Sequence, residues 1–328
     1  MRLRRSDLAR PGYRRHRRGR GVRYLDADGR PITDRAELGR LRDLVIPPAW
    51  RDVWICPHPA GHIQAVGTDA AGRRQYLYHP QWRVRRDVAK FRHVRQVADR
   101  LPRLRRQVAA DLRERGLCRE RVLAALVSLL DLGMFRIGSD QYAAGDDPTF
   151  GVATLRGSHT RVARGCVVFE FPAKGGQAQV RRITDVRVCA VLRALRRRCR
   201  GDQRLFCYWD GRQWRDVRSD EINDYLRQAS GTDMTAKDFR TWHATVLAAT
   251  RLAAHPVPRS TAARRRAVAA VMREVAELLG NTATVARTSY VDPRVIELFQ
   301  RGRVARLDAA EPTRPAAEEA VRRLLALR

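Results

Sequence analysis

The chain has 328 residues and a formal net charge of +31. A hydrophobic content of 44% is normal for a globular protein and excludes wholesale disorder. The longest apolar stretch, Val122–Leu130, is much shorter than the ~20 residues that a membrane-spanning helix needs. Compact domains usually carry a net charge of roughly 2 to 8 in magnitude, so this excess indicates a polyanionic partner, with nucleic acid as the first candidate.

The start of the chain and the cysteines indicate a cytoplasmic protein. The N-terminal run MRLRRSDLARPGYRRHRRGRG has no apolar segment after it, so no secretory signal is expected. A basic surface arm is expected, with an organellar presequence as the less favoured alternative. The six cysteines are irregularly spaced without a CxxC pair, which is typical of free thiols in a reducing compartment. Cys56, His58 and His62 lack a fourth ligand at a standard zinc spacing, so no metal site is predicted.

The predicted elements begin with a β-rich region. A hairpin is expected around the turn 27–29, followed by a short helix and three strands separated by Gly- and Pro-bearing turns. The pattern becomes helical from about residue 86, so the domain boundary is placed near residue 90. The expected elements of this region are strands at 22–26 and 30–33, a helix at 34–44, and strands at 53–56, 62–68 and 75–79.

The rest of the chain is predicted to be mostly helical, with two hairpins inserted. Thr235-Ala-Lys-Asp238 has the form of a helix-opening capping box, and Gly280 is a helix stop. The whole therefore indicates an α+β protein, with a small β-rich N-terminal domain before a larger helical one. The expected elements are helices at 86–116, 119–133, 235–254, 260–279, from 292 and at 311–328, and hairpins at 166–171/178–183 and 205–209/213–217.

Common cofactor motifs are absent from the sequence. It has neither a GxxxxGK[ST] phosphate loop nor a GxGxxG fingerprint, so neither ATP nor a dinucleotide is an expected cofactor. Asp26-Ala-Asp28 is a DxD sequence that could bind a metal, but Asp is also a good turn residue, and the motif lies in a predicted turn.

Lysine is rare in this chain. Of the 66 Lys and Arg residues only Lys90, Lys174 and Lys237 are lysines. Arginine serves phosphate contacts well but cannot give up a proton near neutral pH, whereas lysine can. Each remaining lysine is therefore a candidate for proton transfer, with chance survival in an arginine-rich chain as the alternative.

Five polar residues of the second region form the informative set. They are Arg136 in Met-Phe-Arg-Ile-Gly-Ser, Lys174 at a Gly-Gly hairpin tip, Arg240 in Lys-Asp-Phe-Arg-Thr-Trp-His, Asn281 in Leu-Leu-Gly-Asn-Thr and Tyr290 in Val-Ala-Arg-Thr-Ser-Tyr. Each residue alone has an ordinary structural explanation, such as a surface arginine. The ordered set resembles the type IB DNA topoisomerase family, in its compact poxvirus-like and bacterial form.

The resemblance extends over nearly the whole chain. It implies a DNA-clamping domain at 1–90 and a catalytic domain at 91–328 with the fold of tyrosine recombinases and type IB topoisomerases. It also implies a monomer that acts on duplex DNA in the nucleoid without a metal or a nucleotide cofactor. The N-terminal segments that carry it are Tyr24-Leu-Asp, Val45-Ile-Pro-Pro-Ala-Trp50, Val53-Trp-Ile-Cys-Pro57, Gly61-His62 and Gln75-Tyr-Leu-Tyr-His79.

By resemblance, Tyr290 is the nucleophile that cuts one strand and holds its 3′ phosphate while the DNA swivels. Arg136 and Arg240 bind the scissile phosphate, and Lys174 protonates the departing 5′ oxygen. These types suit the chemistry, because guanidinium forks stabilise charge on phosphate oxygens and lysine can supply a proton. Asn281 matches a fifth residue that is usually His in the viral and nuclear relatives. Since Asn can donate a hydrogen bond but cannot exchange a proton near pH 7, it is expected to bind only.

The resemblance also predicts duplex contacts. Gln75, Tyr76, Tyr78 and Tyr142 match positions that contact bases and backbone in the family, and Lys237 lies in a helix first turn that favours phosphate. The alternative for Tyr76 and Tyr78 is cross-strand packing on one strand face. His243 has no matched role in the family and is interpreted as structural.

Two other functions remain open from the sequence. A site-specific tyrosine recombinase would share the chemistry, but recombinases typically carry His-x-x-Arg where this chain has Lys237-Asp-Phe-Arg240. A non-enzymatic basic nucleoid-binding protein would bind DNA without forming a covalent adduct and would not depend on Tyr290.

Overall fold

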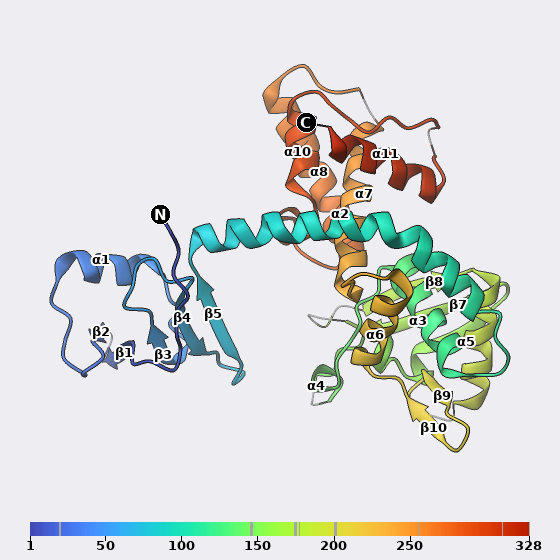
Figure 1. The fold of residues 1–328 in the computed structure, drawn as a ribbon, viewed down its shortest axis with the longest axis horizontal. Helices are drawn as coiled ribbons and strands as arrows, with labels where there is room; N and C mark the ends of the chain where they lie inside the picture. The colour runs from blue at the N-terminus through green and yellow to red at the C-terminus, as the bar shows by residue number, and fades with distance from the viewer. Residues whose placement is uncertain are drawn as a thin grey trace. The chain divides into compact units, whose positions relative to one another are not determined.

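The computed structural model describes residues 1–19, 21–144, 147–173, 176, 178–199, 202–254, 256–309 and 311–327. The chain divides into two compact units, Met1–Lys90 and Phe91–Arg328. The long helix α2 (Pro80–Asp111) belongs to both, since it starts in the first unit and continues into the second (Figure 1). Lys174 lies outside the described residues.

The first unit is an antiparallel five-stranded sheet with one helix. The strand order is β2-β1-β3-β4-β5. Residues of the sheet and of the helix region form a small hydrophobic core, which consists of Leu41, Ile46, Val53, Ile55 and Ala65. The β-rich first region predicted from the sequence is therefore confirmed. Its elements are β1 (Tyr13–Arg18), β2 (Gly21–Leu25), α1 (Arg35–Asp43), β3 (Arg51–Ile55), β4 (Ile63–Thr68) and β5 (Arg74–Tyr78).

Two expectations for this unit were wrong. The N-terminal run is not only a surface arm, because β1 within it pairs with both β2 and β3. The hairpin partner of β2 is thus β1, and the strand expected at 30–33 is reduced to an isolated bridge between Leu25 and Pro31. Asp26 explains the turn between them, since its carboxylate accepts hydrogen bonds from the backbone N–H groups of Asp28 and Arg30.

The second unit is mostly helical, and its core is built around α3. Residues 122–130 of this helix are all buried, as expected of a helix surrounded by other elements. The described elements after α2 are α3 (Arg119–Gly133), α4 (Asp140–Ala143), η1 (Val152–Thr154), η2 (Gly157–His159), β6 (Thr160–Ala163), β7 (Cys166–Pro172), β8 (Ala178–Ile183), α5 (Val186–Arg198), β9 (Cys207–Trp209), β10 (Trp214–Asp216), α6 (Ser219–Ser230), α7 (Ala236–Ala253), α8 (Thr261–Leu279), α9 (Ala283–Val285), η3 (Ala286–Tyr290), α10 (Pro293–Gln300) and α11 (Arg314–Ala326).

Local sequence signals predicted most of these elements. Both predicted hairpins are present, as β7–β8 and β9–β10, and α3 has the predicted bounds. Helices α5 and α6 were not predicted, nor was the strand β6, which extends the β7–β8 hairpin to three strands. The α+β fold class, with a small β-rich region before a larger helical one, is confirmed.

Two further features bear on the predictions. All six cysteines are free thiols, as predicted. Within the described ranges no helix is long and apolar enough to cross a membrane, and no group of three or more His, Cys, Asp or Glu is placed to hold a metal ion. Cys56 and His62 have another role: the His62 ring accepts from the backbone N–H of Ser6 at 2.8 Å, and the Ser6 hydroxyl lies 3.7 Å from the Cys56 sulfur.

Candidate active site

Arg136 follows the abrupt end of α3. Met134 has a left-handed backbone (φ 51°), which ends the helix and turns the chain toward the site. The Arg136 guanidinium is half-buried and faces the C-terminus of α8, where its Nη2 donates to the Gly280 carbonyl at 3.2 Å and to Asn281 Oδ1 at 3.4 Å. This arginine therefore lies beside the predicted fifth residue, although the two are far apart in the sequence.

Arg240 is a buried cation on α7. The carboxylate of Asp238 accepts from the Thr235 backbone N–H at 2.8 Å, which completes the predicted cap, and Arg240 follows within the first turns. Only 5% of Arg240 is exposed, and its Nη1 and Nη2 donate to the carbonyls of Met134 (2.6 Å) and Leu279 (2.8 Å). Its Nε is buried without an acceptor among the described residues. Burial, and then the neighbouring charge of Arg136, lower the pKa of Arg240 to about 10.

Asn281 lies where α8 ends. Gly280 takes the left-handed conformation (φ 60°) that closes a helix, and its N–H bonds back to the carbonyls of the last turn. The Asn281 amide donates to the Leu279 carbonyl at 3.3 Å, while its oxygen accepts from Arg136. The side chain is thus held at the same helix end that both arginines contact.

Tyr290 is the last residue of η3, a single π-helical turn. Such turns are rare and are frequent at functional sites. The guanidinium carbon of Arg240 lies 5.4 Å from the centre of the Tyr290 ring, and the buried Thr245 hydroxyl lies 3.3 Å from the Tyr290 carbonyl oxygen. The same hydroxyl accepts from the N–H of Asp292 at 3.1 Å, so α7 holds the backbone that directly follows the tyrosine side chain.

The structure thus brings together four of the five predicted residues from four separate segments. Arg181 on β8, which was not predicted as a site residue, lines the same small cavity as Arg136 and Arg240. A signal was available, because alternation along β8 places Gln179, Arg181 and the buried Ile183 on one face. The strands that flank the predicted Lys174 tip are paired up to Pro172 and Ala178.

The predicted DNA contacts lie in both units. In the first, the rings of Tyr76 and Tyr78 stack at 6.1 Å on one face of β5, whereas Gln75 points to the other face and donates to Asp69 at 2.9 Å. In the second, Tyr142 on α4 is 52% exposed, and Lys237 is exposed in the first turn of α7. Tyr76, Tyr142 and Lys237 are therefore accessible, while Gln75 already has an internal partner.

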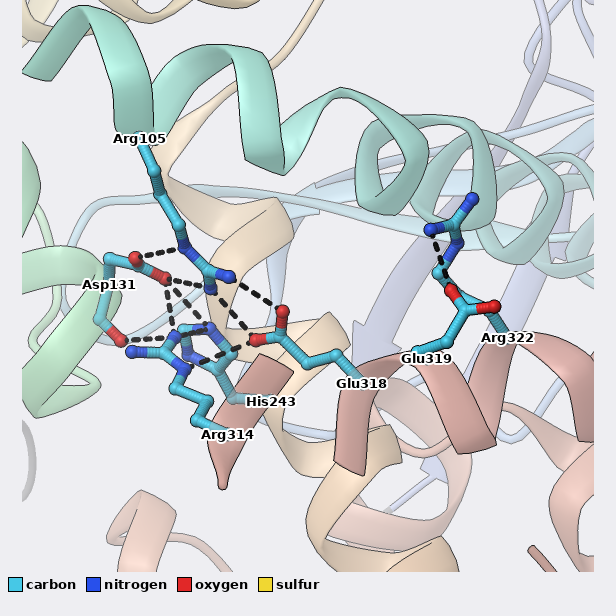
Figure 2. A network of polar contacts seen from close by, with 7 residues as sticks. All are labelled: Arg105, Asp131, His243, Arg314, Glu318, Glu319 and Arg322. Atoms are coloured by element: carbon cyan, nitrogen blue, oxygen red, sulfur yellow. Dashed lines mark hydrogen bonds and ion pairs between the residues drawn. The ribbon is translucent and has the colours of Figure 1, made fainter. Parts of the chain in front are cut away.

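His243, one turn after Arg240 on α7, belongs to a largely buried ionic network (Figure 2). Its Nε2 lies 3.1 Å from a carboxylate oxygen of Asp131 on α3. Arg105 on α2 forms paired hydrogen bonds with both Asp131 and Glu318, and Arg314 on α11 bonds the same two carboxylates. The predicted structural role of His243 agrees with this position.

The network fixes the charge of its members. Burial lowers the pKa of His243 despite its contact with Asp131, because the imidazolium form would lose its hydration. Burial alone would raise the pKa of Asp131, but hydrogen bonds from His243 and Arg105 and the charge of Arg314 hold it well below its usual range. At neutral pH the network therefore contains a neutral histidine and an ionised Asp131.

Comparisons with known proteins agree with this geometry. Residues 79–304 match the model of the eukaryotic DNA topoisomerase I catalytic core, and residues 21–69 match that of the bacterial DNA topoisomerase IB N-terminal domain. A DNA topoisomerase 1B from Acanthamoeba polyphaga mimivirus is 27% identical over 297 residues, which are 88% of each chain. The chain belongs to the type IB DNA topoisomerase family. It is therefore an isomerase that acts on DNA and relaxes it.

Proposed function

We propose that this enzyme relaxes supercoiled duplex DNA through a 3′-phosphotyrosyl intermediate formed on Tyr290, without ATP or a metal ion. The observation that carries the proposal is the convergence of Arg136, Arg240 and Asn281 at one helix end, with the Arg240 guanidinium 5.4 Å from the Tyr290 ring. Buried cations of this kind stabilise an anion better than exposed ones do, because the protein interior screens the attraction between the charges less than water does.

The chemistry balances without an energy source. The phenol oxygen of Tyr290 attacks the phosphorus and loses its proton to solvent, and the bond from phosphorus to the 5′ oxygen breaks. Lys174 protonates that oxygen, which leaves as a hydroxyl. After the free end has swivelled, the 5′ hydroxyl attacks the phosphotyrosyl ester and the steps reverse. One phosphate ester replaces another throughout, so resealing requires no ATP.

Each remaining residue has a binding role in this scheme. Arg136 and Arg240 stabilise the charge that gathers on the phosphate oxygens, and Asn281 donates one hydrogen bond to them. The first unit, through Tyr76 and Tyr78, and the second, through Tyr142 and Lys237, hold the duplex as a clamp. We further propose that the enzyme acts as a monomer on the nucleoid, in the cytoplasm.

The test is relaxation of a supercoiled plasmid in EDTA without ATP. We expect the wild type to relax the plasmid and to leave an SDS-trapped protein–DNA adduct, and Tyr290→Phe to do neither. The control is Tyr208→Phe, which also removes one hydroxyl, here one on β9 that donates to Glu221 at 3.0 Å and is not among the residues of the candidate site. Relaxation by Tyr290→Phe, or a strict need for Mg²⁺ or ATP in the wild type, would contradict the proposal.

A further inference from the structure

Three arginines line one small cavity of the second unit. Arg136, Arg181 and Arg240 face it together with the rings of Phe135, Phe150 and Phe171, and none of its described lining residues is acidic. Three guanidinium groups without a carboxylate are unusual, because buried charges are normally paired. The ion pairs of this unit are formed elsewhere, as in the network around Asp131.

The three arginines bond successive carbonyl groups at the end of α8. Arg181 Nη2 donates to the Leu278 carbonyl at 2.9 Å, Arg240 Nη2 to that of Leu279 at 2.8 Å, and Arg136 Nη2 to that of Gly280 at 3.2 Å. These carbonyls form the negative end of the helix dipole, but they carry only partial charge. They therefore satisfy hydrogen bonds without neutralising the three cations.

Arg181 keeps capacity for another acceptor. Its other described bonds run from Nη2 to Gln179 Oε1 at 2.6 Å and from Nη1 to its neighbour's carbonyl at 3.1 Å. A guanidinium has five N–H donors, so Nε and one N–H of Nη1 have no acceptor among the described residues. Burial and the charge of Arg136 lower the pKa of Arg181, which is the expected effect of a cation that lacks its anion.

We propose that Arg181 is a third arginine of the phosphate site and donates to a non-bridging oxygen of the DNA phosphate that Tyr290 attacks. The inference rests on the proposed function and adds one residue to its binding set. Before DNA binds, the carbonyls of residues 278–280 take the hydrogen bonds that phosphate oxygens receive afterwards. Because the transition state gathers more charge on these oxygens than the ground state, Arg181 contributes mainly to the rate of cleavage.

The first test compares Arg181→Ala with Arg182→Ala. Arg182 is exposed and is the next residue of β8, so it points to the other face of the strand. Adduct formation is measured with enzyme in excess over DNA and at saturation, which separates the rate from affinity. We expect Arg181→Ala to lose roughly 10²-fold or more in rate, as for the loss of one donor to a developing oxyanion. Arg182→Ala should stay within about twofold of wild type.

Two further measurements separate contact from structure. Guanidinium chloride below denaturing concentrations should raise the adduct rate of Arg181→Ala more than sodium chloride of equal ionic strength does, and no such difference would overturn direct contact. If Arg181→Ala fails to fold, Arg181→Lys decides, since it keeps the charge and loses the fork. A folded Arg181→Lys that cleaves at the wild-type rate would overturn the proposal.

The outcomes also separate this proposal from the proposed function. If the wild type forms an adduct that Tyr290→Phe does not, and Arg181→Ala matches Arg182→Ala, the third-arginine proposal fails and the phosphotyrosyl mechanism stands. If the wild type forms no adduct, the phosphotyrosyl mechanism itself fails.

Discussion

At the scale of single residues, the backbone that carries Tyr290 depends on the hydroxyl of Thr245. Thr245 is only 1% exposed. Its hydroxyl lies 2.8 Å from the Thr241 carbonyl oxygen and 3.3 Å from the Tyr290 carbonyl oxygen, and it accepts from the Asp292 N–H. No local sequence signal links Thr245 to Tyr290, because they are 45 residues apart and meet only in the folded chain. The proposed nucleophile follows from a sequence motif, but the contact that supports its backbone could not be predicted from the sequence.

Thr245→Val tests this support. Valine keeps the shape and removes the acceptor of the buried Asp292 N–H, so we expect a loss of about 1–2 kcal/mol in the free energy of unfolding. Because the tyrosine loses its anchor, adduct formation should slow about tenfold or more. Thr250→Val is the control, since among the described residues the Thr250 hydroxyl bonds only carbonyls of its own helix, at 3.0 Å. Equal adduct rates for the two variants would exclude a positioning role for Thr245.

His243 gives a residue-scale prediction about pH. Its folded-state pKa is lowered, so the unfolded chain binds more protons as the pH falls below the usual value of ~6.5. The contribution of His243 to the free energy of unfolding is thus complete above pH ~6.5. Below that pH it is lost, at up to about 1.4 kcal/mol per pH unit. Burial likewise lowers the pKa of His62 and His159, so His243→Gln should reduce the slope and not abolish it.

Urea unfolding between pH 7.5 and 5.0 measures this slope. The control is His16→Gln, because His16 is exposed on β1. A slope in His243→Gln as steep as in wild type and control would show that the histidine is not held neutral in the fold.

At the scale of elements, α11 is joined to the helices around the site by ionic bonds. Glu318 is largely buried and bonds Arg105 of α2 at 2.7 and 2.8 Å and Arg314 at 3.1 Å (Figure 2). The side chain of the next residue, Glu319, is 43% exposed and pairs with Arg322 and Arg323 on its own helix. Breaking a buried pair leaves an uncompensated charge, while exposed pairs contribute little. The two adjacent glutamates therefore form a matched comparison.

Glu318→Ala should destabilise the protein by about 2–3 kcal/mol, because Arg105 and Arg314 then share Asp131 alone. Glu319→Ala should cost less than about 1 kcal/mol. Thermal or urea unfolding distinguishes the two, and a loss for Glu319→Ala as large as for Glu318→Ala would show that burial does not decide the strength of these pairs.

Elements with strong local signals could be predicted from the sequence, and the others show why such signals are not sufficient. The capped helix α7 and the Gly280 stop of α8 follow from single caps. Strand β1 has no apolar alternation, because its sequence is YRRHRR. It is held by pairing with two neighbouring strands and by the Arg15 guanidinium, which donates to the carbonyls of Ile46 and Trp50. Such contacts are non-local and leave no periodic pattern.

At the scale of the whole molecule, several acidic residues have structural partners within the protein. Asp34, Asp185 and Asp292 cap helices, and Asp131 and Glu318 pair with Arg105 and Arg314. Because 66 Lys and Arg residues stand against 35 Asp and Glu residues, the excess of +31 is carried almost wholly by arginine. This distribution predicts that binding of DNA is driven by release of counterions from many phosphates.

The dependence on salt follows from this charge. A protein that contacts about 6–10 phosphates loses roughly 10³- to 10⁵-fold in affinity between ~50 and ~200 mM salt. At low salt the enzyme should remain on one plasmid through many cycles, so fully relaxed and untouched plasmids coexist. At higher salt it should dissociate between cycles, so that all plasmids pass together through a ladder of topoisomers.

Two measurements check this. We expect Tyr290→Phe to bind without cleaving, so its affinity for duplex DNA at several salt concentrations should give the slope directly. Gel electrophoresis of plasmid time courses gives the relaxation pattern of the wild type. A flat slope, or a relaxation pattern that does not change with salt, would show that most of the arginine charge lies away from the DNA. Arg182→Ala shows how the salt slope reports on a single arginine. If Arg182 contacts a phosphate, its removal should reduce the slope by about 1, and if it faces solvent, the slope should not change.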